Sequence, residues 1–286
     1  MTLNELAAEF TAAYVVPRLR PSTARGYAVN LHRHILPRFG SREINTLTFH
    51  DLDDLTSALR PHLSNRSVVY VHATLRKMLA FAIKREYLTR NPYAGFDMPR
   101  VERYRYRILT PDEIRRALIA CKDTPLEIPV TLALNYGLRR GECLGLIPAL
   151  DLDPVGHVLH VQRTRGAEHG KPVVTPCKTD HGNRLILLTE EHARLLSAYR
   201  NGGGYACPLS PHALDIQFRA FLEAQTLPPI RFHDLRHSYA TFMLSKGVNP
   251  KIVCAVLGHS SVSVTLDIYS HPDVQMQRAC LAAWDD

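Results

Sequence analysis

The sequence lacks the features of several large protein classes. Its six cysteines are scattered, and no two of them form a C-x-x-C pair. A disulfide framework or a cysteine-rich zinc site would need such pairing, so the pattern favours a reduced compartment. No apolar run approaches the length of a membrane span, and the N-terminus has neither the basic start nor the apolar stretch of a signal peptide. We therefore expect a cytoplasmic protein without membrane contact.

Repeats and nucleotide-binding motifs are also missing. No segment recurs along the chain, and the glycine-rich residues 201–204 are not followed by the Gly-Lys-Ser/Thr of a phosphate-binding P-loop. The chain has 286 residues, of which 45% are hydrophobic. This is enough for two domains of ordinary size, each with its own core.

Charge is distributed unevenly along the chain. The formal charge of +8 favours a polyanionic partner. Residues 1–105 hold 16 Lys and Arg against 9 Asp and Glu, whereas residues 106–286 hold 19 against 18. A basic first part beside a nearly neutral second part indicates a DNA-binding domain followed by a catalytic domain. A merely solvated basic face would give the same charge.

The first hundred residues predict a small all-helical unit. Apolar residues recur at helical spacing in four segments, and turn or capping residues separate them. The predicted helices span residues 3–16 (closed by Pro17 and Pro21), 22–39 (capped by Ser22), 48–59 (begun by Thr48) and 64–83 (begun by Ser64 or Asn65).

The second part predicts helices around a small sheet. Thr110 and Glu113 form a capping box, a further helix runs from about residue 128 to residue 146, and Thr189 and Ser210 begin two more. Alternating apolar residues predict strands at 155–164, 171–176 and 184–189, the last two joined as a hairpin by turn residues 180–183. The predicted fold class is mainly α with a small antiparallel β-sheet (α+β).

The most informative stretch is residues 231–271. Two apolar segments with helical spacing are separated by a Gly-x-Asn-Pro turn. His233 and Arg236 should therefore lie one turn apart on one helix face, with His259 after the next helix and Tyr269 near a third, short one. Arginine clamps phosphate oxygens and tyrosine can be a covalent nucleophile, so the set points to phosphate chemistry.

Two other interpretations of this stretch stay open. One is a helix-turn-helix regulator over residues 233–257. The other is a zinc site, which Arg236 would oppose by repelling the ion. Its ligands would be His233, His237, Cys254 and His259.

The sequence resembles the tyrosine recombinase (phage integrase) family. The resemblance rests on HDLRHS at 233–238, LGH at 257–259, Tyr269 followed by Ser-His, GLRRGE at 137–142 and CKTDHGNRLILL at 177–188. It implies an active site on a catalytic domain that follows a helical, SAM-like core-binding domain. The implied catalytic set is Arg139, Lys178, His233, Arg236, His259 and the nucleophile Tyr269, with Glu142 bracing the site.

The resemblance also implies the role of each group. Tyr269 would attack the scissile phosphate, form a 3′-phosphotyrosine and free a 5′-hydroxyl. Arg139 and Arg236 would clamp the phosphate oxygens, and His259 would donate a further hydrogen bond to them.

The remaining roles concern protons. Lys178, at or beside the predicted hairpin tip, would be the general acid for the 5′-oxygen, and His233 the general base or positioner of the phenol. Neither a metal ion nor ATP would be required, because the arginines supply positive charge and the covalent link stores the bond energy. We expect no cofactor.

The predicted domains are a helical core-site DNA-binding domain at 1–97, a linker at 98–107 and a catalytic domain with a tail at 108–286. We expect the core-binding pattern to start almost at Met1, without a preceding arm-binding domain. The tentative DNA contacts are Arg25, Arg33, Arg66, Arg76, Lys77, Arg103 and Arg105.

The predicted function is site-specific recombination for a phage or mobile element. The alternatives are a Xer-like dimer resolvase with the same chemistry and a non-catalytic DNA-binding regulator. The expected partners are double-stranded DNA with core-type attachment sites, three further copies of the chain on synapsed DNA, and a directionality factor, all at the bacterial nucleoid. The apolar tail at 279–284 should dock on a neighbouring copy or on its own domain.

Overall fold

The computed structural model describes residues 1–102, 106–168, 171–177, 182–259 and 261. Contacts between Cα atoms divide the chain into two compact units, Met1–Tyr104 and Arg105–Asp286. Each unit has its own hydrophobic core. The finer division into a domain at 1–97 and a linker at 98–107 stays a prediction. No helix among the described residues combines the length and apolar character needed to cross a membrane.

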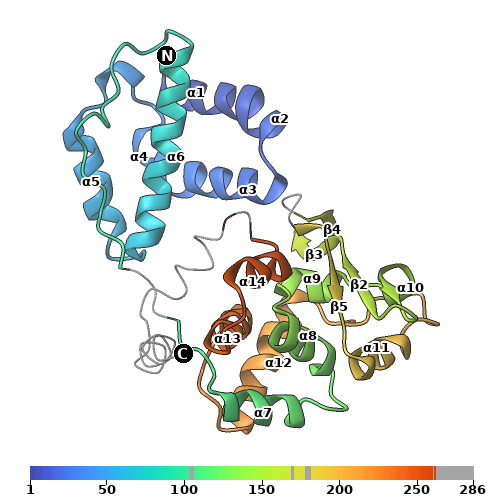
Figure 1. Ribbon diagram of the computed structural model, residues 1–286. Coiled ribbons are helices and arrows are strands. Elements are labelled where there is room, and N and C mark those ends of the chain that lie inside the picture. The colour runs from blue at the N-terminus through green and yellow to red at the C-terminus, as the bar shows by residue number, and fades with distance from the viewer. Residues whose placement is uncertain (103–105, 169–170, 178–181, 260, 262–286) are drawn as a thin grey trace, which may run out of the picture. The chain divides into compact units, whose positions relative to one another are not determined.

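The described part of the first unit contains helices and one isolated β-bridge but no strand. Helix α6 runs through its middle, with α5 on one side and α1 to α3 on the other (Figure 1). Its elements are α1 (Leu3–Phe10), η1 (Thr11–Val15), α2 (Val16–Arg18), α3 (Pro21–Asn30), η2 (Leu31–Ile35), α4 (Leu36–Phe39), η3 (Ile44–Thr46), α5 (Phe49–Leu59) and α6 (Asn65–Lys84).

Local capping begins two of these helices as predicted. The side chain of Thr48 accepts a hydrogen bond from the backbone N–H of Asp51, and the carboxylate of Asp51 accepts one from the backbone N–H of Thr48. The side chain of Ser64 accepts from the backbone of Ser67 at the start of α6. Such caps satisfy backbone donors within one turn, so their signal is confined to a few consecutive residues.

Two predicted boundaries are wrong. Pro17 does not close the first helix, which continues to Arg18. A π-helical turn precedes the proline, and its wider i→i+5 hydrogen bonding relieves the clash that the ring would make with an α-helical turn. Ser22 does not cap the second helix, which begins at Pro21, because proline has the backbone angle of a first helical residue.

The second unit surrounds a central helix with helices and two small sheets. In Figure 1, α8 and α9 lie between α13 and α14 on one side and the strands on the other. Its helices are α7 (Pro111–Ala120), α8 (Glu127–Tyr136), α9 (Arg140–Gly145), α10 (Pro148–Asp151), α11 (Glu190–Ser197), α12 (Pro211–Ala224), α13 (Phe232–Ser245) and α14 (Pro250–Leu257).

The strands of this unit form two antiparallel sheets. A three-stranded sheet has the order β1 (Leu152–Asp153), β2 (Val158–Val161), β5 (Arg184–Leu187), and a hairpin pairs β3 (Arg163–Glu168) with β4 (Lys171–Pro176). The predicted hairpin between residues 171–176 and 184–189 is therefore wrong. The predicted single strand at 155–164 is divided, because Val158–Val161 pairs with β5 whereas the strand from Arg163 pairs with β4.

Helix α8 is the core of the second unit. Every residue from Ile128 to Leu134 is buried, so the helix is covered on all sides. The predicted continuous helix to residue 146 is wrong, because Gly137 adopts the left-handed conformation (φ 64°) and ends α8. The predicted caps at Thr110, Thr189 and Ser210 are confirmed.

Candidate active site

The break between α8 and α9 positions the first arginine. Arg139 is the N-cap of α9, two residues after the left-handed Gly137. The carboxylate of Glu142 accepts a hydrogen bond from the backbone N–H of Arg139 (2.8 Å) and another from its Nη1 (2.7 Å). The spacing of these two residues is thus a capping arrangement in which Glu142 fixes the guanidinium of Arg139.

The second arginine comes from α13. His233 and Arg236 both lie on this helix, as predicted. The Arg236 side chain is buried, and its Nη1 donates to the carbonyl oxygen of Gly137 at 2.7 Å. Its Nη2 is buried and has no hydrogen-bond partner among the described residues. A buried cationic donor without a partner is costly, so this side of the guanidinium is suited to an anion.

The end of α14 brings in His259. Gly258 is left-handed and ends the helix, and the backbone N–H of His259 donates to the carbonyl of Cys254. Arg139 Nη2 donates to the carbonyl oxygen of Gly258 at 2.9 Å. His259 therefore follows directly on a backbone group that is bonded to the first arginine, and it lies after the second predicted helix as expected.

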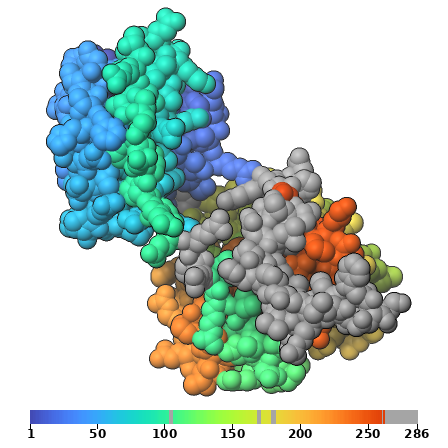
Figure 2. Space-filling view, turned by 60° about the vertical axis from the view of Figure 1, so that its left-hand side comes forward, coloured from blue at the N-terminus to red at the C-terminus, as the bar shows by residue number. Residues whose placement is uncertain are grey.

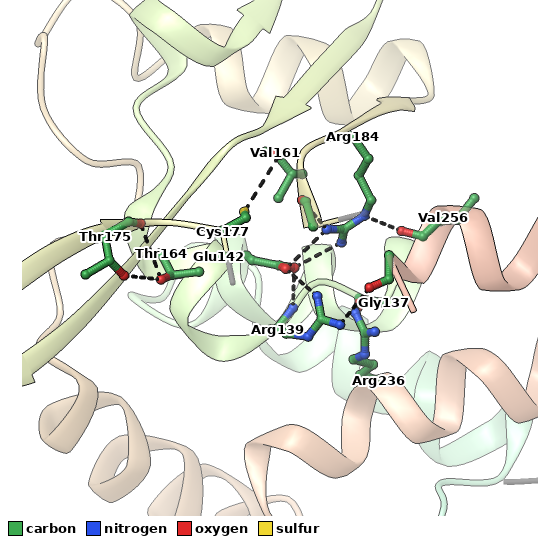
Figure 3. A network of polar contacts seen from close by, with 12 residues as sticks. Gly137, Arg139, Glu142, Val161, Thr164, Thr175, Cys177, Arg184, Arg236 and Val256 are labelled. Carbon is green, nitrogen blue, oxygen red and sulfur yellow. Dashed lines mark hydrogen bonds and ion pairs between the residues drawn. The ribbon is translucent and has the colours of Figure 1, made fainter. Parts of the chain in front are cut away.

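A third arginine, which the sequence analysis did not identify, completes the cluster. Arg184 on β5 donates from Nη1 to Glu142 Oε1 (3.1 Å) and from Nη2 to Glu142 Oε2 (3.0 Å). Figure 3 shows Arg139, Arg184 and Arg236 pointing toward the same region around Glu142. A single arginine at the start of a strand has no local signal, because its partner lies 42 residues away in sequence.

The cluster has an excess of positive charge. Burial raises the pKa of Glu142, but the hydrogen bonds and charge of Arg184 and the charge of Arg139 outweigh it, so the pKa is lowered and the group is ionised. Burial, followed by the charge of Arg139, lowers the pKa of Arg236 to about 9, which keeps it protonated at neutral pH. Three guanidinium groups thus surround one carboxylate, which favours an added anion.

Both candidate histidines are neutral at neutral pH. Desolvation, followed by the charges of the nearby His237 and Arg236, lowers the pKa of His233 to about 4. Burial and the charges of Arg236 and Arg139 lower the pKa of His259 to about 4 as well. A neutral imidazole can accept a proton at one nitrogen and donate a hydrogen bond from the other.

An open cavity begins at this cluster. It has a volume of about 940 Å³ and extends from Arg139 and His233 along α12, where Asp215 and Arg219 line it. Arg140, next to the first arginine, is ion-paired with Asp215 on its wall. Of the clustered arginines, Arg139 lines this cavity, which gives a ligand access to it from that side.

The other predicted site residues fall into two groups. Lys178, Tyr269, Arg103 and Arg105 lie outside the described residues. The remaining tentative DNA contacts are all exposed side chains of the first unit, on α3, η2 and α6: Arg25, Arg33, Arg66, Arg76 and Lys77. Figure 2 shows the residues of α6, in cyan to teal, on the surface of this unit.

Comparison with known proteins identifies relatives of both units. The model of the phage integrase family matches residues 107–276, and the model of the phage integrase N-terminal SAM-like domain matches residues 2–59. The ICEBs1 integrase of Bacillus subtilis (strain 168) is 26% identical over 284 residues, which covers 91% of this chain and 77% of the relative. The tyrosine recombinase XerC of Alcanivorax borkumensis is 28% identical, and the match covers 90% of this chain and 86% of the relative.

Solved structures show the same fold. The Tn1549 transposon integrase in complex with transposon right end DNA superposes with a TM-score of 0.83 at 22% identity and covers 100% of both chains. A lambda integrase tetramer bound to a Holliday junction gives a TM-score of 0.72 at 19% identity, over 96% of this chain and 80% of that one. The helical first unit and the mixed second unit thus have the architecture of known integrases.

The family model covers more than half of the chain, and the structure holds Arg139 and Arg184 on the carboxylate of Glu142. The predicted fold class, the family and the recombinase activity are therefore confirmed. The chain belongs to the phage integrase family and is a site-specific recombinase of the tyrosine type.

Proposed function

We propose that this recombinase cleaves and rejoins double-stranded DNA at a core-type attachment site, with Tyr269 as nucleophile, for a phage or mobile element. The observation that carries the proposal is the Arg236 guanidinium beside Arg139, which is buried and whose Nη2 has no hydrogen-bond partner among the described residues. Glu142 is fully occupied by arginines, so it does not compete for this donor. A phosphodiester is an anion of suitable geometry for such a fork.

The chemistry is a transesterification that conserves bond energy. The phenol oxygen of Tyr269 bonds to the scissile phosphorus, and the bond from phosphorus to the 5′-oxygen breaks. Neutral His233 takes or orients the phenol proton, and Lys178 protonates the leaving 5′-oxygen. Arg139, Arg236 and His259 stabilise the charge that develops on the non-bridging oxygens. Attack by another 5′-hydroxyl reverses each step on a new strand.

Replacement of the nucleophile tests this proposal. Tyr269→Phe removes only the phenol oxygen, so it should leave DNA affinity within about threefold while abolishing the covalent complex on a nicked substrate. Denaturing gel electrophoresis of labelled DNA measures the complex. The unaltered protein is the positive control. A covalent complex that survives in Tyr269→Phe would overturn the nucleophile assignment.

The assembly follows from the same chemistry. Exchange of four strands needs four nucleophiles, so we propose a homotetramer on two synapsed duplexes, the assembly in which a lambda integrase is known on a Holliday junction. Because the forward and reverse reactions make and break the same bonds, a directionality factor would have to supply the bias by binding. The place of action would be the bacterial nucleoid, where the DNA lies.

A Xer-like resolvase is the second candidate. The similarity to a XerC recombinase over 90% of this chain favours it specifically. The two candidates differ in their DNA rather than in their chemistry. Sequencing of DNA trapped covalently on the protein in cells should identify the ends of a mobile element for an integrase, and a chromosomal or plasmid resolution site for a resolvase.

A further inference from the structure

Arg184 occupies an unusual position for an arginine. It is the first residue of β5, where it pairs with Val161 of β2, and it is only 9% exposed. Four separate hydrogen bonds hold its guanidinium, and they reach three different parts of the second unit. Burial of a long cationic side chain is costly, so the hydrogen bonds from its partners must offset the loss of hydration.

The first partner is the carboxylate of Glu142. The two terminal nitrogens of Arg184 bind its two oxygens as a fork, at 3.1 and 3.0 Å. The backbone and Nη1 of Arg139 bind the same two oxygens. A carboxylate offers about four acceptor sites, so these four donors fill it. Arg184 and Arg139 are therefore held by one shared anion.

The other partners are backbone carbonyls near catalytic positions. Arg184 Nε donates to the carbonyl of Val256, in the last turn of α14, three residues before His259. Arg139 donates to the carbonyl of Gly258, so the end of this helix is bound by two arginines. The negative end of a helix dipole favours such cations. Arg184 Nη1 also donates to the carbonyl of Gly182, four residues after Lys178 in sequence.

We propose that Arg184 is a positioning residue for strand cleavage: through Glu142 and the end of α14 it holds Arg139 and His259 in place. This inference rests on the proposed function. Arg184 would not touch the phosphate itself. Its contribution would be to keep Arg139, Glu142 and the end of α14 in one arrangement. Small displacements of catalytic groups lower the rate strongly.

A comparable ion pair in the same unit provides a matched control. Arg163 donates to the buried carboxylate of Asp151 at 2.8 Å, and the side-chain exposures of this pair are 19% and 1%. For Arg184 and Glu142 they are 7% and 1%. Among the described residues, the Arg163 guanidinium bonds to Asp151 and makes no hydrogen bond to Arg139, Glu142 or His259. Arg163→Met therefore removes a similar pair without disturbing the arginine cluster.

The experiment compares Arg184→Met, Arg184→Lys and Arg163→Met in the full chain. Single-turnover formation of the covalent complex on a nicked substrate is measured at saturating protein, with DNA affinity and thermal unfolding measured alongside. We expect Arg184→Met to lower the cleavage rate about 100-fold, with DNA affinity within about threefold. Arg184→Lys keeps the positive charge, so it should fold. It loses the paired hydrogen bonds to Glu142, so it should cleave about tenfold more slowly than the unaltered protein.

Two further readouts separate positioning from simple stabilisation. Without Arg184, burial should raise the pKa of Glu142. As the pH is lowered, cleavage by Arg184→Met should therefore decline at a higher pH than cleavage by the unaltered protein. Arg184→Met should also lower the cleavage rate by a smaller factor in a Glu142→Gln background than in the unaltered protein, because both changes act through the same carboxylate. Arg163→Met should change neither the pH profile nor the cleavage rate.

The outcomes are distinct. If the unaltered protein forms no covalent complex, the proposed function fails and this inference fails with it. If the unaltered protein cleaves and folded Arg184→Lys cleaves at the same rate, only the positioning role is overturned. The same holds if Arg184→Met and Arg163→Met lose activity equally and with unshifted pH profiles.

Discussion

The two terminal nitrogens of Arg236 have different surroundings. One terminal nitrogen is bonded to the carbonyl of Gly137, which fixes the orientation of the guanidinium plane. The other is buried without a partner among the described residues, so it can bind a phosphate oxygen without breaking an existing bond. A lysine could not divide these tasks in the same way, because its ammonium group has no rigid planar fork.

The protonation state of His233 makes a prediction at the residue scale. Its surroundings lower the pKa from the ordinary 6.5 to about 4, so the ring should remain able to accept a proton at pH 5.5 to 6, where an ordinary histidine is mostly protonated. Cleavage should therefore persist at this pH and decline only as the pH falls toward 4. NMR of labelled imidazoles, with His233→Gln for assignment, measures the titration directly.

The sign of the linked stability effect follows from the same shift. Between pH 6.5 and about 4 the unfolded chain binds a proton that the folded site does not. The contribution of His233 to stability is therefore present above pH 6.5 and is lost as the pH falls through about 4. A ring that titrates near 6.5 in the folded protein would contradict both expectations.

At the scale of elements, the junction of α8, α13 and α14 depends on Gly137. Its left-handed conformation (φ 64°) ends α8, and a Cβ there would lie 2.4 Å from Leu257 Cδ2 and 2.7 Å from Tyr239 Cδ1. Leu257 ends α14 and Tyr239 lies on α13. Three helices thus approach closely at the residue whose carbonyl holds Arg236.

Gly137→Ala should therefore lower both stability and cleavage. The left-handed backbone alone costs an alanine about 1 kcal/mol, and the displaced side chains should add a similar or larger cost to the free energy of unfolding. Gly247→Ala is the matched control, because Gly247 is also left-handed (φ 78°) but its Cβ would meet nothing within 4 Å. Urea unfolding of both variants measures the difference. Equal destabilisation would show that the helix junction tolerates the methyl group.

At the scale of the whole molecule, charge separates the two units. Residues 1–105 carry a net charge of +7 and residues 106–286 a net charge of +1. The basic side chains considered for DNA contact are exposed on α3, η2 and α6, whereas the arginines of the cleavage site are in the second unit and half-buried or buried. We therefore propose that nonspecific DNA binding belongs mainly to the first unit and the cleavage chemistry to the second.

This separation predicts how binding responds to salt. Arg66→Ala, at the start of α6, should weaken DNA binding at every sequence and reduce the slope of log K against log salt by about 1, because one phosphate contact is lost. Arg115→Ala is the control, since this exposed arginine of α7 is paired with Asp112. Fluorescence anisotropy at several salt concentrations measures both slopes. An unchanged slope for Arg66→Ala would remove this residue from the DNA interface.

The amino-acid sequence determined the parts of this protein whose partners lie within a few residues. Thr48, Thr110 and Ser210 begin helices through bonds to the third residue after them, and the Arg139–Glu142 pair is such a cap as well. The spacing of these residues is therefore visible without a structure, and the resemblance to a known family predicts the roles of Arg139 and Glu142.

Only the tertiary structure decided which distant groups meet. Arg184 and Glu142 are 42 residues apart, and Arg236 and Gly137 are 99 apart. The strand at 184–187 pairs with β2 rather than with residues 171–176, although its alternation allows either. A local pattern fixes which face of a strand or helix is apolar but not which partner covers it, because that choice depends on the packing of the whole unit.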